Sequence, residues 1–108
     1  MSQLTIAECE HLRSEAQEMR VSAIRTRIAA AITFCDVAES QARWYPPAHA
    51  RASLERIWHS IGELQQHIDD PRHVAPNIAT NLRQNLESVR TRATGLGLVI
   101  GTQRASSR

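Results

Sequence analysis

Residues 43–48 read RWYPPA, and the adjacent prolines Pro46 and Pro47 divide the chain into a long first segment and the rest. No proline or glycine occurs before Pro46, so no helix-breaking residue interrupts that first segment. The residue before a proline is pushed out of the helical region, which predicts an extended Tyr45. Pro47 then fits the first turn of a new helix, where its missing N–H costs nothing. This stretch predicts that one helix ends at Trp44 and the next begins at Pro47.

Upstream of this break, the pattern is that of a long amphipathic helix over residues 5–44. Thr5 and Glu8 have the spacing of a capping box, in which each side chain bonds to the other residue's backbone N–H. Small and apolar residues then recur at steps of three and four, in two stripes that are out of phase. The first stripe is Cys9, Leu12, Ala16, Met19 and Ala23, and the second is Ile24, Ile28, Ala31, Ile32, Cys35, Ala38 and Ala42. Because the phase changes between them, a bend or break near residues 20–26 is left open.

Two further helices are predicted downstream, over residues 47–69 and 76–94. Their apolar stripes are Ala50, Leu54, Ile57, Trp58, Ile61, Leu64 and Ile68 in the first, and Ile78, Leu82, Leu86, Val89, Ala93 and Leu96 in the second. Between them, HIDDPRHVAP (67–76) reads as a polar turn, since Pro71 cannot continue a helix and Pro76 suits a helix start. Gly95 is expected to end the last helix in the left-handed conformation.

These elements predict an all-α fold, an antiparallel helical bundle of three main helices with a long first one, because short connections make neighbouring helices antiparallel. Residues 1–101 are expected to form a single helical domain. The polar residues 102–108 are expected to form a disordered C-terminal tail. The sequence leaves open whether Trp44 and Tyr45 are an exposed contact pair or a buried plug at the hinge, and the plug is favoured because aromatic residues usually bury most of their area.

Residues 34–57 (FCDVAESQARWYPPAHARASLERI) carry a spacing found in a repeat family. The matching positions are Phe34, Val37, Ala38 and Gln41 in the first helix and Ala50 and Leu54 in the second. The chain resembles a single tetratricopeptide-repeat-like helical hairpin with an added helix, as in small uncharacterised bacterial helical proteins. The resemblance covers roughly residues 30–95 and implies a helical hairpin scaffold, with no known reaction.

Composition and charge limit the classes of function. The net charge is +2, but residues 1–70 carry −3 and residues 71–108 carry +5, an asymmetry that can mark a face for nucleic acid or an acidic partner. No apolar run approaches the ~20 residues that span a bilayer, so no membrane partner is expected. The first residues lack the pattern of a secretory signal, which favours a cytoplasmic location. Cys9 and Cys35 would lie roughly 39 Å apart on an unbroken helix, so reduced thiols are expected.

Two groups of residues could be read as metal ligands. One is the turn at 67–76, where His67 and His73 accompany Asp70, and the other is the series Glu55, His59, Glu63 and His67 on one helix face. A zinc site needs three or four convergent ligands, and the series lies roughly opposite the apolar stripe, so it should face water. We therefore assign no catalytic, cofactor-binding or metal-binding residue and no cofactor, and we expect that the chain is not an enzyme.

Helix lengths indicate where a binding surface could lie. The first helix would be ~60 Å long, the second ~35 Å and the third ~30 Å, so the last two cannot cover all of the first. The stripe Cys9, Leu12, Ala16, Met19 and Ala23, here called the N-terminal stripe, would be left exposed. We therefore expect a non-enzymatic module for protein–protein interaction or self-assembly, which forms a homodimer or binds a partner protein through this stripe.

Two alternatives remain open. One is weak nucleic-acid binding by the basic C-terminal third, through Arg72, Arg83, Arg90, Arg92, Arg104 and Arg108. That third has no aromatic residue on which bases could stack, which disfavours nucleic acid as a partner. The other is a metal-binding helical protein that uses His59, Glu63, His67 and His73.

Overall fold

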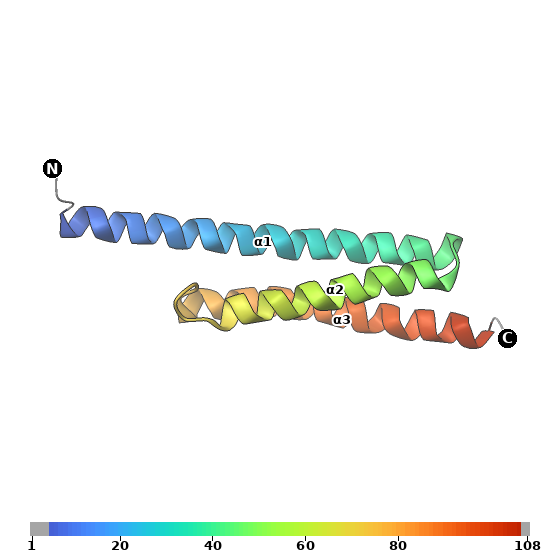
Figure 1. The fold of residues 1–108 in the computed structure, drawn as a ribbon. Helices are drawn as coiled ribbons and strands as arrows, with labels where there is room; N and C mark the ends of the chain where they lie inside the picture. Colours follow the sequence, from blue (N-terminus) through green and yellow to red (C-terminus); the bar gives the residue numbers. More distant parts are fainter. Residues whose placement is uncertain (1–4, 107–108) are drawn as a thin grey trace.

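The computed structural model describes residues 5–106, with side chains described for residues 5–101. It contains three helices, α1 (Ile6–Trp44), α2 (Pro47–Asp69) and α3 (Pro76–Ser106). Consecutive helices run antiparallel, and each packs against the other two in an elongated bundle of 71 × 25 × 15 Å (Figure 1). No strand occurs among residues 5–106, and the predicted all-α bundle of three helices is confirmed.

The connection between α1 and α2 follows from the two prolines. Tyr45 is extended, with φ −127° and ψ 165°, and its N–H donates to the carbonyl of Gln41 at 2.9 Å. Pro47 is the first residue of α2, as predicted. The expectation of a buried aromatic plug is wrong, because the side chains of Trp44 and Tyr45 are 78% and 59% exposed. Trp44 follows the buried Ala42 by two residues, which turns it about 200° around the helix and away from the core.

The helix α1 contributes to the core only from Val21 onward. Its buried residues recur at steps of three and four, the spacing of a coiled-coil seam, and are Val21, Ile24, Ile28, Ala31, Cys35, Ala38 and Ala42. Facing them are fully buried side chains of the other two helices, among them Ile57, Leu64 and Ile68 from α2 and Leu82, Leu86 and Val89 from α3. The seven buried residues of α1, from Val21 to Ala42, are here called the core seam of α1.

The helix α1 runs without interruption through residues 20–26, so the bend or break that the sequence left open does not occur. Each helical residue advances by about 100°, which places the N-terminal stripe about 110° around α1 from the core seam. The change of phase in the sequence is therefore a change of face on one helix. The N-terminal stripe lies on a flank that does not point at α2 and α3.

The third helix is longer than the sequence predicted, and its expected end at residue 94 is wrong. Among the described residues no glycine has a positive φ, so Gly95 does not cap the helix. Leu96 and Ile100 continue the buried stripe of α3 at steps of three and four, and Ile100 packs with Ala42 and Ala50 at the hinge end of the bundle. Residues 102–106, expected in a disordered tail, form the last turns of α3, while 107–108 lie outside the described residues.

The helical conformation of Gly95 leads to a first prediction. Nothing lies within 4 Å of a Cβ built at Gly95, and the same is true of Gly62 in α2. Replacing Gly95 with alanine should raise the free energy of unfolding by about 0.5–1 kcal/mol, because alanine loses less backbone entropy in a helix. Chemical denaturation measures this gain, and Gly62→Ala should give a similar one. A loss of stability in Gly95→Ala would mean that α3 ends at this glycine after all.

Candidate interaction surface

The N-terminal part of α1 extends beyond the rest of the bundle (Figure 1). α1 has 39 residues and α2 has 23, and α2 begins at the opposite end of α1, so it ends before it reaches the start of α1. The first buried residue of α1 is Val21. Residues 6–20, here called the overhang, therefore project by about 22 Å without a packed neighbour helix.

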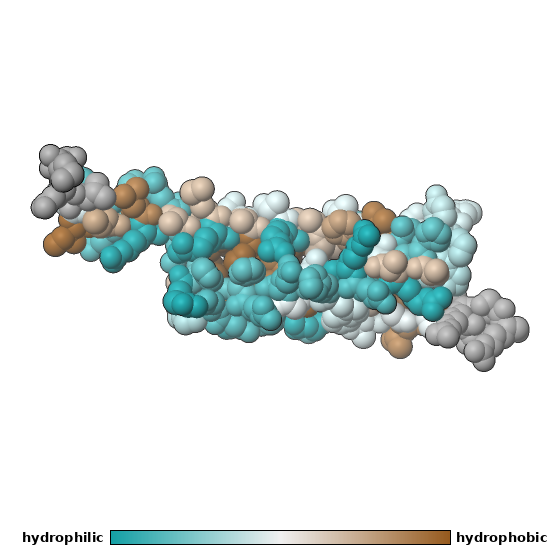
Figure 2. Space-filling model, in the orientation of Figure 1, coloured by the Kyte–Doolittle hydropathy of each residue, from teal (hydrophilic) through white to brown (hydrophobic). Residues whose placement is uncertain are grey.

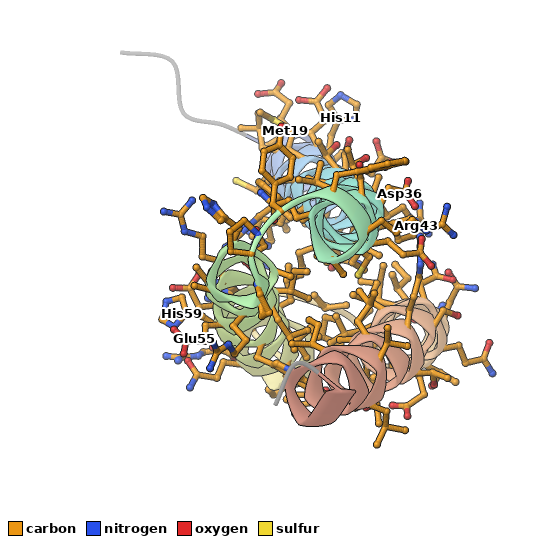
Figure 3. The ribbon with its side chains drawn as sticks, turned by 90° about the vertical axis from the view of Figure 1, so that its right-hand side faces the viewer. His11, Met19, Asp36, Arg43, Glu55 and His59 are labelled. Atoms are coloured by element: carbon orange, nitrogen blue, oxygen red, sulfur yellow. The ribbon has the colours of Figure 1, made fainter. Side chains whose placement is uncertain are left out.

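Apolar side chains of the overhang are open to solvent. Leu12 is 49% and Met19 is 73% exposed, and Ala23 is also exposed, while Cys9 and Ala16 are half-buried. Figure 2 shows hydrophobic residues on the overhang, set between hydrophilic ones. Viewed along the bundle, Met19 lies on the side of α1 away from α2 and α3 (Figure 3). The structure thus places Cys9, Leu12, Ala16 and Met19 on one uncovered flank of the overhang, and Ala23 follows them where His67 and His73 begin to cover α1.

Local contacts hold the overhang in a helical conformation at both ends. At its start, the Glu8 N–H donates to the Thr5 hydroxyl oxygen at 3.1 Å, which satisfies one N–H that no helical carbonyl can reach. At its base, Arg20 donates from Nε to the carbonyl of His73 at 3.3 Å and ties α1 to the α2–α3 turn. His11 pairs with Glu15 one turn away, at 3.0 Å. The overhang is a helix with a polar surface and one apolar flank.

The turn HIDDPRHVAP is held by its own charged groups. The Asp70 carboxylate accepts from the backbone N–H of Arg72 at 2.9 Å and from its guanidinium at 3.1 and 3.2 Å. These bonds lower the pKa of Asp70 to about 2. Val74 is fully buried beneath the turn. The two aspartates of this stretch therefore serve to close α2 and shape the turn.

Its histidines do not complete a metal site. The rings of His67 and His73 lie 6.1 Å apart edge to face, and His73 Nε2 is 3.6 Å from an Asp70 oxygen. Asp69 is engaged elsewhere, by Gln65 at 2.8 Å and by Arg83 at 3.0 Å, and these bonds lower its pKa. Across the part of the chain that the structure describes, no group of three or more His, Cys, Asp or Glu residues is placed to hold a metal ion.

The series of Glu and His residues on α2 faces solvent. Figure 3 shows Glu55 and His59 pointing away from the bundle. His59 pairs with Glu63 at 2.9 Å, and Arg27 of α1 reaches the same carboxylate at 2.8 Å. The bond from Arg27 is the largest cause of the lowered pKa of Glu63, followed by the charge of His59. Glu63 thus links α2 to α1 across the surface, which is a structural role.

The arginines of the basic C-terminal third are bound to carboxylates where the structure describes them. Arg72 and Arg83 pair with Asp70 and Asp69 of the turn. Arg90 pairs with Glu87, and Arg92 contacts both Asp36 and Glu39 of α1, the latter at 3.0 Å. Arg104 and Arg108 lie outside the residues with described side chains. Paired arginines offer a phosphate backbone less free charge than the sequence count suggests.

Exposed apolar residues continue along α1 beyond the stripe that the sequence singled out. Phe34 is 49%, Val37 43% and Trp44 78% exposed. The sequence does hold a signal for them, because Ala23, Ala30, Val37 and Trp44 repeat at intervals of seven. Sequence reasoning missed this because Phe34 and Val37 were assigned to the tetratricopeptide-like hairpin and Trp44 to the hinge. Exposed apolar residues therefore occur along α1 as far as Trp44, although α2 contacts this side of α1 at Arg27 and Gln41.

No family model, curated protein or solved structure matches this chain. The resemblance to a tetratricopeptide-like hairpin therefore stays a prediction. Among the described residues, no helix is both long and apolar enough to cross a bilayer.

The Asp70 turn leads to a prediction on acid stability. Because the folded-state pKa of Asp70 is about 2, against an ordinary 3.8, its carboxylate stabilises the fold above pH 3.8. That contribution is lost as pH falls from 3.8 toward 2. Asp70→Asn keeps an oxygen for the Arg72 N–H but removes the charge. Denaturation of both proteins between pH 6 and 2 should show wild type more stable at the upper end and the difference shrinking toward pH 2. A difference that stays constant over this range would contradict the assignment.

Proposed function

We propose that this chain is a non-enzymatic self-assembly module that forms a homodimer through the overhang of α1. The observation that carries the proposal is that residues 6–20 form a helix with no packed neighbour while Leu12 and Met19 stand exposed on one flank. A solvated helix of this length is marginal by itself, because most helical stability in proteins comes from packing an apolar face. A second helix laid on this flank would supply that packing.

A helix of a different protein is the next occupant to consider. Among the described residues, the structure offers no competing site of comparable definition: the acidic and histidine residues of α2 face solvent, and the arginines with described side chains that belong to the basic third are paired. We keep the tetratricopeptide-like hairpin and the cytoplasmic location as part of this proposal, supported by the sequence alone. Nucleic-acid binding has no observation in its favour beyond the excess of arginine in residues 71–108.

The proposal predicts a mass near twice 12.1 kDa at high concentration, measured by size exclusion with light scattering over roughly 1–500 μM. The double variant Leu12→Glu, Met19→Glu should be monomeric over the same range, because a dimer would bury the new carboxylates in its interface. Both side chains are exposed in the single chain, so at a concentration where wild type is also monomeric the two proteins should unfold at the same temperature.

A control is Val99→Glu, which makes one substitution of the same kind at a half-exposed aliphatic residue of α3, at the other end of the bundle. Its mass should follow that of wild type at every concentration. A wild-type protein that is monomeric up to the highest concentration, or a dimer that is indifferent to both overhang substitutions, would overturn the proposal.

A further inference from the structure

The N-terminal stripe has the repeat of a coiled-coil seam, with steps of three, four, three and four. In heptad notation Cys9, Ala16 and Ala23 occupy a positions, and Leu12 and Met19 occupy d positions. Leucine at d is a residue choice found in parallel two-stranded coils. The seam is already in helical form in the single chain, because α1 is continuous from Ile6. Association would therefore order few additional backbone residues.

The charges beside this seam follow a fixed order. Glu8 and Glu15 each precede an a position, and Arg13 and Arg20 each follow a d position. In a parallel coil, a residue that precedes an a position faces the residue five places further along the other helix. Two such pairings would join glutamate to arginine, Glu8 with Arg13 and Glu15 with Arg20, and the third would join Ser22 to Arg27. Turning one helix over would instead bring glutamate opposite glutamate and arginine opposite arginine, which repel.

Building on the self-association proposed above, we propose that two copies of this chain join in parallel and in register through their overhangs. The ion pairs would be Glu8 with Arg13 and Glu15 with Arg20 of the second copy, each formed twice by the two-fold symmetry. The two bundles would then lie at the same end of the coil, side by side, rather than at opposite ends. The charge order beside the seam is what selects this arrangement over the antiparallel one.

The single chain leaves these charged groups available. All four residues are exposed, and the Glu15 side chain is 55% exposed even with His11 beside it. Arg20 uses Nε for its bond to His73, and its guanidinium carries four further N–H donors. The helix cap at Thr5 uses the backbone N–H of Glu8, so this bond does not involve the Glu8 carboxylate. Among the side chains of residues 5–101, the ion pair between His11 and Glu15, which is exposed, is the one that has to break before the coil forms.

The coil ends where α2 begins to cover the same flank. Arg27 is the next residue in the series of Arg13 and Arg20, and in this structure it is bound to Glu63 of α2 at 2.8 Å. Further along, Gln41 bonds with Ser53 of α2 at 2.5 Å. The seam available to a second copy is therefore short, with alanine at two of its five positions. We expect a reversible dimer with a dissociation constant on the order of 10 μM, because small interfaces are typical of weak association.

Parallel, in-register pairing brings the two copies of Cys9 into the same layer of the coil. Neighbouring residues in such a layer come within the Cα separation that a disulfide requires. An antiparallel pairing that aligns the stripe over its length would set Cys9 beside Met19 and separate the two thiols by about 15 Å along the axis. Cys35 is fully buried and cannot take part. Cys9 is therefore a natural probe of orientation.

The ion pairs are tested by reversing one charge. Glu15→Arg should raise the dimer dissociation constant about tenfold, because two attractions become repulsions between arginines. Adding Arg20→Glu to the same chain should restore it to within about threefold of wild type. The matched control is Glu18→Arg, which makes the same charge change on the helix face away from the seam and should leave the constant unchanged. Sedimentation of each full-length variant measures these constants. An antiparallel coil would show no change in Glu15→Arg, since like charges would face each other before and after.

Orientation is tested by oxidation of the full-length protein with diamide at a concentration where the dimer forms. We expect a disulfide-linked dimer on a non-reducing gel, and none in Cys9→Ser. A dimer in solution that neither cross-links through Cys9 nor responds to Glu15→Arg would overturn the parallel arrangement while leaving self-association intact. Absence of any dimer by sedimentation would instead overturn the proposed function, so the two failures are distinguishable.

Discussion

The structure depends on where the prolines stop the helices. Pro46 and Pro47 end α1 at Trp44, and Pro71 with Pro76 allows α2 only 23 residues before the chain must turn again. Because α2 starts at the end of α1 and is shorter by 16 residues, it cannot return to the start of α1. The third helix then extends at the hinge end, where it gains contacts with Ala42 and Ala50. The start of α1 is therefore uncovered because the prolines allow α2 fewer residues than α1.

In the proposed dimer, folding and association would use different parts of a single helix. From Val21 onward, the core seam of α1 packs on α2 and α3, and the ion pairs of Glu63 and Arg92 with α1 hold the outer edges together. Before Val21, the same helix has its apolar residues on a different flank and its charges in an order suited to a second helix. A substitution in the overhang should change what the protein binds without disturbing how the bundle folds.

The sequence predicted the helices well where local rules decide them and poorly where tertiary contacts do. The ends of α1 and α2 follow from proline chemistry at Tyr45 and Asp70, and they were predicted within a residue. The end of α3 was predicted wrongly. Glycine is a common helix cap, but at Gly95 the helix goes on because the buried stripe continues through Leu96 and Ile100. The exposure of Trp44 could not be read from its type either, since its direction depends on which face of α1 meets the core.

The same distinction applies to the candidate site. Periodicity alone identified the N-terminal stripe and its five residues, because an apolar repeat is visible in any helix. Its meaning required the structure, which shows that the phase change near residue 23 is a change of face and not a kink. Once the helix is known to be continuous and its start uncovered, the positions of Glu8, Arg13, Glu15 and Arg20 acquire directions in space. A linear sequence holds their order, but only a continuous helix gives that order the directions on which the proposed parallel pairing rests.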